Sequence, residues 1–524
     1  MIRVLISWFA LVSTAFSQSY TIDWGPVHKM GGRDYVEGII KSDSLGFFVL
    51  RSRYNALSDR FTFLDYYPME TMSRSFSSAL VFPESNKEVN IPFRLYFEDL
   101  YRVGSNSVLF MTSYNHEKDR HSAYAQVLNV NGKPQGPVYE LAKIKAERKS
   151  NRGKFHFTTS PNRQYVLVYN HEPFDQYNDE KFGFTVVDTA FQPVWSNEYS
   201  LPYKSQNFIP EDYRLDNLGN AYMLSRVFFT REQEREKNVK GSNYNYTILR
   251  FQPEDEKNQF QEYVIRLKDK HVVNASMRIS PNNDLVVAGY YADDKNLNKI
   301  TGLYYFTFPF GASAPERISM HALPDGFIPD FQTDVPSRFG EDGEPQLINT
   351  QFILLEDGSQ ILVTEHTLVT ETCFTDFRTA LTTCNYNYYF NDIFLVKIGA
   401  DETVKWKIKI PKRQVTRNDG GMYSSFSLGL MAGRVVILYN EHPKNFELKN
   451  DRGLMFMTDP KKASVALLEI DAQGHVKKQP LFSNDKRKTW FRPRIMHQPD
   501  QGSMLICTTR LRQMAFARIR LTAE

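Results

Sequence analysis

The amino-acid sequence predicts an all-β fold built from a repeated unit. Aromatic residues make up 14% of the 524 residues, with 29 Tyr and 39 Phe. Short runs rich in Val, Ile, Tyr and Phe end at Gly, Asn, Asp or Pro, which is the composition of strands and turns. A chain of this length exceeds the usual size of one core, so either several domains or one large repeat-built body is expected.

The repeat begins with a polar turn that leads into an apolar strand. SPNRQ (160–164), DNLGN (216–220) and SPNND (280–284) precede YVLVYN, AYMLSR and LVVAGYY, and EDGSQ (356–360) and PDQGS (499–503) precede similar runs. With less regular copies, the apolar strand starts eight times, near Phe47, Val108, Tyr165, Ala221, Val286, Ile361, Val436 and Leu505.

Each apolar strand has a strand before it and a hairpin of two strands after it, which gives four strands per unit, A to D. Four strands at an interval of about 55 to 75 residues are typical of a β-propeller blade with enlarged loops. The sequence therefore predicts an eight-bladed β-propeller. Seven blades remain the alternative if the irregular first unit is an extension.

The two ends of the chain predict how the ring closes. The last unit ends in MAFARIRLTAE, a third strand without a fourth, while SYTIDWGPV near the N-terminus has the pattern of a fourth strand. Because a propeller must cover the edges where its last blade meets its first, we predict that the N-terminal strand completes the eighth blade.

The turn and strand pattern resembles the WD40-like propeller repeats of exported bacterial proteins, with SPN turns in place of their SPDG. The resemblance covers nearly the whole chain after its first residues. It implies a fold and does not imply a chemistry.

The first residues predict export. MIRVLISWFALVSTAFSQS has one basic residue, an apolar stretch from Val4 to Phe16 and a small-x-small site, so residues 1–17 are predicted to be a signal peptide. Residues 18–524 would form a single domain without a transmembrane segment. The leader, with Gln after the cleavage site, resembles those of exported Bacteroidota proteins, which implies the periplasm or secretion.

Three cysteines are few for an exported chain of this size. Cys373 and Cys384 flank a ten-residue stretch that a hairpin closes easily, so a disulfide is predicted between them. Cys507 lies in an apolar run and is expected to be a buried free thiol. No paired CxxC or HExxH pattern occurs, and no metal or cofactor is expected.

One face of the predicted propeller carries the insertions. The A–B and C–D turns are short, whereas long loops are expected at the opposite end of the blades, at 229–243, 321–349, 365–391 and 440–462. Long loops on a rigid scaffold commonly hold binding sites. This end of the blades, where the B–C and D–A connections lie, is called the insertion face below.

Three D–A segments of the insertion face are basic. Residues 143–154, 411–417 and 485–494 carry +5, +3 and +4, although the whole chain carries +4. Such a face can attract an acidic protein segment, an anionic glycan or lipid headgroups. The alternative is a solvated rim paired with nearby acids. The candidate binding residues are Lys143, Lys145, Arg148, Lys149, Lys412, Arg413, Lys486, Arg487, Trp490 and Arg492. Nucleic acid is not expected for an exported chain of near-neutral charge.

The tetrapeptide YNHE occurs twice and YNEH once, each at the end of a strand B. The residues concerned are Tyr114, His116, Tyr169, His171, Tyr439 and His442. Four other units end strand B differently, which argues against a ring of metal ligands. We interpret the motif as structural: Tyr packs between blades, and Asn and His form hydrogen bonds in the turn that follows.

The sequence predicts a non-catalytic protein. It contains no GxSxG elbow, sialidase Asp-box or EF-hand loop. Glycoside cleavage would need paired carboxylates at the central mouth, where Glu211, Asp212, Asp293 and Asp294 are placed by their units. The expected function is a protein-interaction platform of the cell envelope, for example an accessory or plug of a type IX secretion translocon. A glycan-binding or glycan-cleaving propeller is the alternative.

Overall fold

The structure is a computed structural model. It describes residues 19–522 except 43, 55–59, 80–94, 130–131, 176, 237–241, 255–258, 294–296, 298, 329–345, 377 and 379–380. The predicted signal peptide lies outside the described residues. None of the helices within the described part of the chain is long and apolar enough to cross a membrane.

The described residues form eight antiparallel sheets, numbered here in chain order. Sheet 1 contains β3 (Asp34–Ser42), β4 (Gly46–Tyr54), β5 (Arg60–Pro68) and β6 (Phe76–Ala79). Sheet 2 contains β7 (Tyr96–Val103), β8 (Asn106–Asn115), β9 (Arg120–Leu128) and β10 (Pro134–Lys145). Sheet 3 contains β11 (Lys154–Thr159), β12 (Val166–His171), β13 (Asp179–Val187) and β14 (Pro193–Lys204). Sheet 4 contains β15 (Phe208–Leu215), β16 (Ala221–Phe228), β17 (Tyr244–Phe251) and β18 (Gln261–Val264).

The second half of the chain repeats this order with small additions. Sheet 5 contains β19 (His271–Val272), β20 (Ser276–Ile279), β21 (Leu285–Ala292), β22 (Gly302–Phe308) and β23 (Ile318–Ala322). Sheet 6 contains β24 (Gln346–Leu354), β25 (Gln360–Asp376), β26 (Leu381–Ile398), β27 (Val404–Ile410) and β28 (Gln414–Arg417). Sheet 7 contains β29 (Ser427–Met431), β30 (Arg434–Glu441), β31 (Ser464–Ile470) and β32 (Val476–Ser483). Sheet 8 contains β33 (Trp490–Asp500), β34 (Ser503–Arg510), β35 (Gln513–Thr522), β1 (Ser19–Trp24) and β2 (His28–Lys29).

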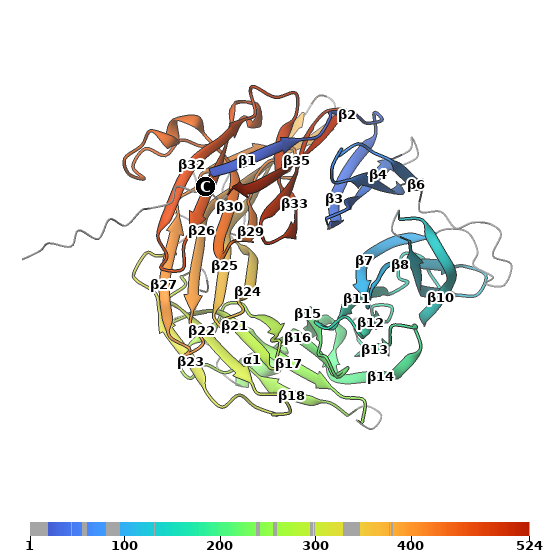
Figure 1. The fold of residues 1–524 in the computed structure, drawn as a ribbon. Coiled ribbons are helices and arrows are strands. Elements are labelled where there is room, and N and C mark those ends of the chain that lie inside the picture. Colours follow the sequence, from blue (N-terminus) through green and yellow to red (C-terminus); the bar gives the residue numbers. More distant parts are fainter. Residues whose placement is uncertain are drawn as a thin grey trace, which may run out of the picture.

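Short helices occur only in connections within the described residues. They are η1 (Ser205–Asn207), α1 (Arg231–Glu236), η4 (Pro443–Phe446) and η5 (Pro460–Lys462). Figure 1 shows the sheets arranged in a ring around a central opening, with the chain running round it once.

The ring closes through the two ends of the described chain. β1 pairs antiparallel with β35, from Ser19 opposite Thr522 to Trp24 opposite Ala517. The blue β1 lies beside the red β35 in Figure 1. The predicted pairing of the N-terminal strand with the last unit is therefore confirmed.

Apolar side chains fill the spaces between neighbouring sheets. The described residues form eight buried clusters, and each cluster joins two adjacent sheets. One of them joins sheet 8 to sheet 1 through Leu505, Phe516, Phe47 and Tyr67. Since burial of apolar surface is the main favourable term in folding, the ring is held by contacts between sheets as well as by hydrogen bonds within them.

The apolar strand of the repeat is the second strand of every sheet except sheet 5, where the two short strands β19 and β20 precede it. β4, β8, β12, β16, β21, β25, β30 and β34 each begin within two residues of a predicted start. β21 is buried along its whole length. Because this strand packs against sheets on both of its sides, its sequence is a continuous apolar run rather than an alternating one.

The turn before the apolar strand needs a left-handed backbone at one position. Arg163, Gly219, Asn283 and Gly358 all have positive φ, from 62° to 90°. Arg163, Gly219 and Asn283 occupy the fourth position of the repeated turn in sheets 3 to 5, and Gly358 occupies the third position of EDGSQ in sheet 6. Gly and Asn adopt this conformation readily, which explains the turn composition that the sequence repeats.

One predicted long loop is a hairpin. Residues 365–391 belong almost entirely to β25 and β26, which pair as far as Asp376 opposite Leu381, well beyond the four-strand body of sheet 6. The loop prediction for this segment was wrong because its alternating Thr, Tyr and Phe residues form strands. The predicted 229–243 segment contains α1, and 440–462 contains η4 and η5. Most of 321–349 lies outside the described residues.

Candidate functional site

The extended hairpin projects from the insertion face, where its tip is joined by the predicted disulfide. Cys373 and Cys384 are bonded and lie opposite one another in β25 and β26. Glu371 lies close to both sulfur atoms, but a disulfide does not offer thiolates to a metal. Val369, Phe374 and Tyr386 are 45%, 69% and 39% exposed on this hairpin.

The other cysteine matches its prediction. Cys507 is a buried free thiol in β34, and burial raises the pKa of its thiol to about 12. A thiol with this pKa is inert at neutral pH and serves as a small apolar side chain.

The YNHE motif ends the second strand in sheets 2, 3 and 7, as predicted. The ring of Tyr169 lies 4.3 Å from that of Tyr213 in the next sheet, and Tyr439 is fully buried between sheets 6 and 7. Asn115 Oδ1 accepts from the backbone of Glu117 at 2.9 Å.

The histidines of the motif have separate surroundings. His171 Nε2 lies 2.6 Å from Glu180 Oε1, His442 Nδ1 accepts from Lys444 N at 3.3 Å, and His116 is exposed. Tyr114 is half-buried. These contacts support the structural interpretation of the motif.

The predicted basic face is only partly a surface. Lys412 is 0% exposed, and its Nζ lies 2.8 Å from Glu365 Oε1. Arg492 is 6% exposed and donates to Val36 O and the Tyr35 hydroxyl. These two residues do not belong to an exposed patch, because their side chains turn inward to satisfy buried acceptors between sheets.

Other members of the basic set are partly engaged. Arg413 pairs with Asp392, the guanidinium of Arg487 lies 3.3 Å from the ring centroid of Trp24, and Trp490 lies under Arg510. Lys486 is exposed.

The first basic segment remains exposed, with one change of position. Lys143 and Lys145 are exposed but belong to the end of β10 rather than to a loop. Arg148 and Lys149 are exposed in the connection that follows. Their proposed role in binding stays a prediction.

A large cavity opens where sheets 2, 3 and 4 meet on the insertion face. It has a volume of ≈ 1340 Å³ and lies over the first strands β7, β11 and β15. Lys149 to Lys154 and the end of the second YNHE copy, His171 and Glu172, contribute to its lining. The predicted acids Glu211 and Asp212 also line it, so segments singled out for three different reasons converge here. Asp293 is paired with Lys270 elsewhere, and Asp294 lies outside the described residues.

The wall from sheet 4 carries Glu211 and Asp212 at a β-bulge. The register of β15 against β16 shifts between Pro210 and Asp212, so Glu211 is the extra residue. Asp212 Oδ1 accepts from Tyr213 N at 2.9 Å. Glu211 pairs with Arg226, and Asp212 Oδ2 lies 2.8 Å from Arg214 and 3.6 Å from Arg278.

The wall from sheet 2 carries a second pair in the same arrangement. The register of β7 against β8 shifts between Phe97 and Asp99, which makes Glu98 the extra residue. Asp99 Oδ1 accepts from Leu100 N at 2.8 Å. Glu98 accepts from Thr112 Oγ1 at 2.6 Å. Neither carboxylate has an ion-pair partner among the described residues.

Burial raises the pKa of all four carboxyls. The hydrogen bond from Thr112 and the charge of Arg152 lower the pKa of Glu98 and so oppose the effect of burial. For Asp99, only hydrogen bonds from Tyr101 and Leu100 lower the pKa. For Glu211 and Asp212 the opposing groups include Arg226, Arg214 and Arg278. Glu98 is nevertheless exposed to the cavity, so a ligand can reach it.

Aromatic rings line the cavity together with the two acidic pairs. The rings of His156 and Tyr213 are stacked with centroids 5.7 Å apart. Burial lowers the pKa of His156, and the charges of Lys154 and His171 act in the same direction. A neutral imidazole and phenol rings beside carboxylates can bind hydroxyl groups, amides or an organic cation.

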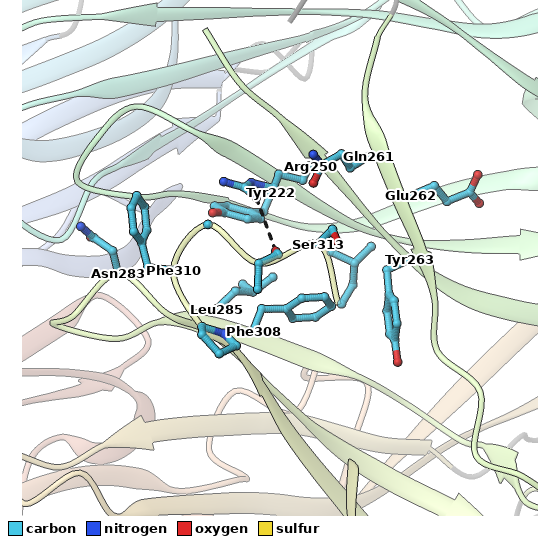
Figure 2. A pocket seen from close by; sticks show the side chains of 14 residues that line it. Tyr222, Arg250, Gln261, Glu262, Tyr263, Asn283, Leu285, Phe308, Phe310 and Ser313 are labelled. Atoms are coloured by element: carbon cyan, nitrogen blue, oxygen red, sulfur yellow. Dashed lines mark hydrogen bonds between the residues drawn. The ribbon is translucent and has the colours of Figure 1, made fainter. Parts of the chain in front are cut away.

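A second, much smaller cavity lies on the opposite face, between sheets 4 and 5. It has a volume of ≈ 20 Å³ and is lined by Tyr222, Arg250 and the turn around Ala312. Figure 2 shows Arg250 beside Tyr222 at this pocket, where Arg250 Nη1 donates to Ala312 O at 3.4 Å. This volume holds about one water molecule, so we do not regard it as a ligand site.

Sequence reasoning missed Glu98, Asp99 and His156. The signal for the two acids was present, because FEDLYR (97–102) and PEDYR (210–214) both place Glu-Asp before Tyr. The first strands of the units were the least regular part of the repeat, and the correspondence becomes clear once the two bulges are aligned.

The ring of antiparallel sheets, each packed on two neighbours, defines a β-propeller. No family model and no curated protein matches the chain.

Solved structures with some likeness include the β-propeller domain of the trilobed protease from Pyrococcus furiosus, at 9% identity, 87% of this chain, 98% of that chain and TM-score 0.36. The WD40 domain of SCAP from fission yeast has 9% identity, 96% and 94% coverage and TM-score 0.37. A protein of unknown function from Bacteroides caccae has 11% identity, 72% and 93% coverage and TM-score 0.29. At these values the likenesses carry no information about activity or ligand.

Proposed function

We propose that the chain is an exported, non-catalytic, eight-bladed β-propeller that acts as a protein-interaction platform in the bacterial cell envelope. The partner binds the insertion face. In an envelope of the Bacteroidota type, an accessory or plug component of a type IX secretion translocon is a role of this kind, and the periplasm is the proposed location.

The observation that carries the proposal is the difference between the two ends of the sheets. One end has short turns, while the other has a long hairpin, the segment with η4 and η5, and the large cavity. Phe374 and Val369 keep much of their surface exposed on a hairpin that a disulfide joins near its tip. Exposed apolar side chains on a rigid projection are typical of a protein contact.

Capture of a partner from a detergent extract of the source envelope tests the proposal. We expect the mature chain to capture an envelope protein in stoichiometric amount, and Val369→Ser with Phe374→Ser to lose about tenfold or more in affinity. Leu218→Ser is the matched control, because Leu218 is 54% exposed at a short turn of the opposite face. Equal binding by the hairpin variant and the parent would refute the assignment of this face.

Neutralising Lys143, Lys145, Arg148 and Lys149 together tests the basic segment separately. If it contributes, affinity falls and the salt dependence of binding becomes weaker. Unchanged affinity at low salt would remove the basic segment from the interface.

A glycan-binding or glycan-cleaving propeller is the second candidate. The cavity favours it, because carboxylates and stacked rings line a space larger than most small-molecule sites. A glycan array with the mature chain tests this candidate. Binding that is lost in Asp212→Asn but retained in the hairpin variant would favour it over the protein platform.

A further inference from the structure

We propose that the cavity over β7, β11 and β15 binds a lysine or arginine side chain of an extended peptide segment, and that Glu98 and Asp99 receive its positive charge. This inference rests on the proposed function, since it names the chemistry of a partner segment at the same face.

The cavity is large enough for a segment of a chain. Its volume of ≈ 1340 Å³ exceeds the roughly 300–1,000 Å³ of most small-molecule sites. It is open on the insertion face, next to connections that would contact the rest of a partner. A side chain with a few residues on each side therefore fits better than an isolated small molecule.

The charges of the cavity select the ligand. On the sheet 4 wall, three arginines already pair with Glu211 and Asp212. Asp99 lies opposite Phe110 in sheet 2, as Asp212 lies opposite Leu224 in sheet 4. The residues two positions further along these strands are Tyr101 and Thr112 in sheet 2. In sheet 4 they are Arg214 and Arg226. Glu98 and Asp99 consequently line the cavity as carboxylates without an ion-pair partner among the described residues, and a ligand cation would form charge-assisted hydrogen bonds with them.

The other charged groups at this place come from three elements. Arg152 acts on Glu98 through its charge without forming an ion pair, and its guanidinium lies 5.3 Å from the ring centroid of Tyr96. Lys149 and Lys154 lie at the rim, with Glu172 from the second YNHE copy. A free cation is repelled by these bases, whereas a peptide also offers carbonyl oxygens that they can bind.

The aromatic side chains that line the cavity fit the same ligand. Tyr101, His156 and Tyr213 line the cavity beside the two acids. A guanidinium or ammonium group near such rings gains about 0.5–2 kcal/mol from the ring quadrupole.

A metal ion is a poorer occupant. Among the described residues, the group of three or more close ligand atoms is Glu371 with the two disulfide cysteines, and Glu98 and Asp99 belong to none. Divalent metal ions need more oxygen ligands than this pair supplies.

Two labelled hexapeptides test the proposal. The first is Gly-Ser-Arg-Arg-Ser-Gly, and the second has citrulline in place of both arginines, which keeps shape and removes charge. Binding to the mature chain is measured by fluorescence anisotropy at about 0.05 M salt. We expect the arginine peptide to bind at least about tenfold more tightly than the citrulline peptide. Because the chain carries +4 overall, non-specific attraction of a cationic peptide is not expected.

Substitutions in the pair locate the binding. Glu98→Gln with Asp99→Asn, and separately Glu98→Lys, should each weaken arginine-peptide binding by about tenfold or more. Glu117→Gln is the matched control, because Glu117 is an exposed acid in a turn of the same sheet. Circular dichroism confirms that each variant is folded.

Equal binding of the two peptides, or unchanged binding in both pair variants, would overturn the inference. Binding of a neutral hexasaccharide that displaces the arginine peptide and is insensitive to the pair variants would also overturn it, in favour of the glycan candidate. Loss of peptide binding in the pair variants together with unchanged capture of the envelope partner would support the cavity site but separate it from the proposed platform.

Discussion

Two Glu-Asp pairs line the cavity, one from sheet 2 and one from sheet 4, and they differ in the groups around them. Both lie at a bulge of a first strand, and in both the Asp accepts from the next backbone N–H. Glu211 and Asp212 have three arginine partners, whereas Glu98 and Asp99 have a threonine, a tyrosine and the backbone. The same local sequence thus produces a pair with arginine partners in one sheet and, among the described residues, a pair without an ion-pair partner in the other.

The difference teaches that the motif itself does not decide the role of its acids. The bulge fixes where the carboxylates point, and the residues around it decide whether a cation meets them. Arg214 and Arg278 meet Asp212, and the residue two positions along the neighbouring strand meets Glu211. Thr112 and Arg226 occupy that position in sheets 2 and 4. Because uncompensated charge in a partly buried place is costly, it is more informative about ligands than a paired charge is.

Removing one Asp from each pair should give the largest contrast. Asp212→Asn leaves Arg214 and Arg278 facing each other, and burial together with the Arg214 charge already lowers the pKa of Arg278 to about 10. We expect a loss of about 2 kcal/mol in the free energy of unfolding. Asp99→Asn leaves no described cation unpaired and should change the free energy of unfolding by less than about 0.5 kcal/mol. Urea unfolding with unchanged m-values measures both.

Equal losses in the two Asn variants would show that the pairs are energetically alike. In that case, the contrast drawn from the ion pairs would not describe their energetics.

Arg226→Thr gives sheet 4 the residue that sheet 2 has at the equivalent position, Thr112. Glu211 then keeps its place but loses its cation, so we expect a loss of about 1 kcal/mol, less than for Asp212→Asn because one ion pair is lost instead of two. Arg434→Thr serves as the control, because it removes an arginine that pairs with Glu469 within sheet 7, away from the cavity. A loss larger than that of Asp212→Asn would reverse the ranking of the two acids.

The pH dependence should show the smallest effect. Burial raises the pKa of Glu98 and Asp99 above the ordinary values of 4.5 and 3.8. A raised carboxyl pKa means that the folded state holds its proton more tightly, so stability falls as pH rises from these ordinary values through the raised ones. The variant Glu98→Gln with Asp99→Asn lacks this fall and should become more stable relative to the parent over that interval. Urea midpoints at several pH values check it, and a constant difference between the two proteins would contradict it.

The sequence predicted the fold because the repeat is carried by local features. The turns need a left-handed residue and the second strands need continuous apolar side chains, and both leave a direct trace in the residues, as at Asn283 and in LVVAGYY. The disulfide was predictable for the same reason, since its spacing suits a hairpin.

The site was less predictable because it depends on which way long side chains turn. Lys412 and Arg492 lie in basic segments, yet each turns inward to acceptors on other strands, and no local pattern distinguishes them from the exposed Lys149. Glu98 and Glu211 likewise have similar neighbours in sequence. Their difference comes from Thr112, which contacts Glu98, and Arg226, which contacts Glu211. Each of these residues comes close to its acid only after the strands pair.

The pairing of β1 with β35 sets the order in which the molecule can be completed. The first strand described, beginning at Ser19, has its partner at the far end of the chain, so it cannot pair until β35 has been synthesised. Closing so long a loop makes this a non-local and slow contact. Until the two strands pair, the outer edge of β35 and the apolar side chains Tyr20, Ile22 and Trp24 remain uncovered. The predicted cleavage site lies next to this strand, so a retained leader would hold the closing strand at the membrane, and an uncleaved precursor should be more sensitive to proteases than the mature ring.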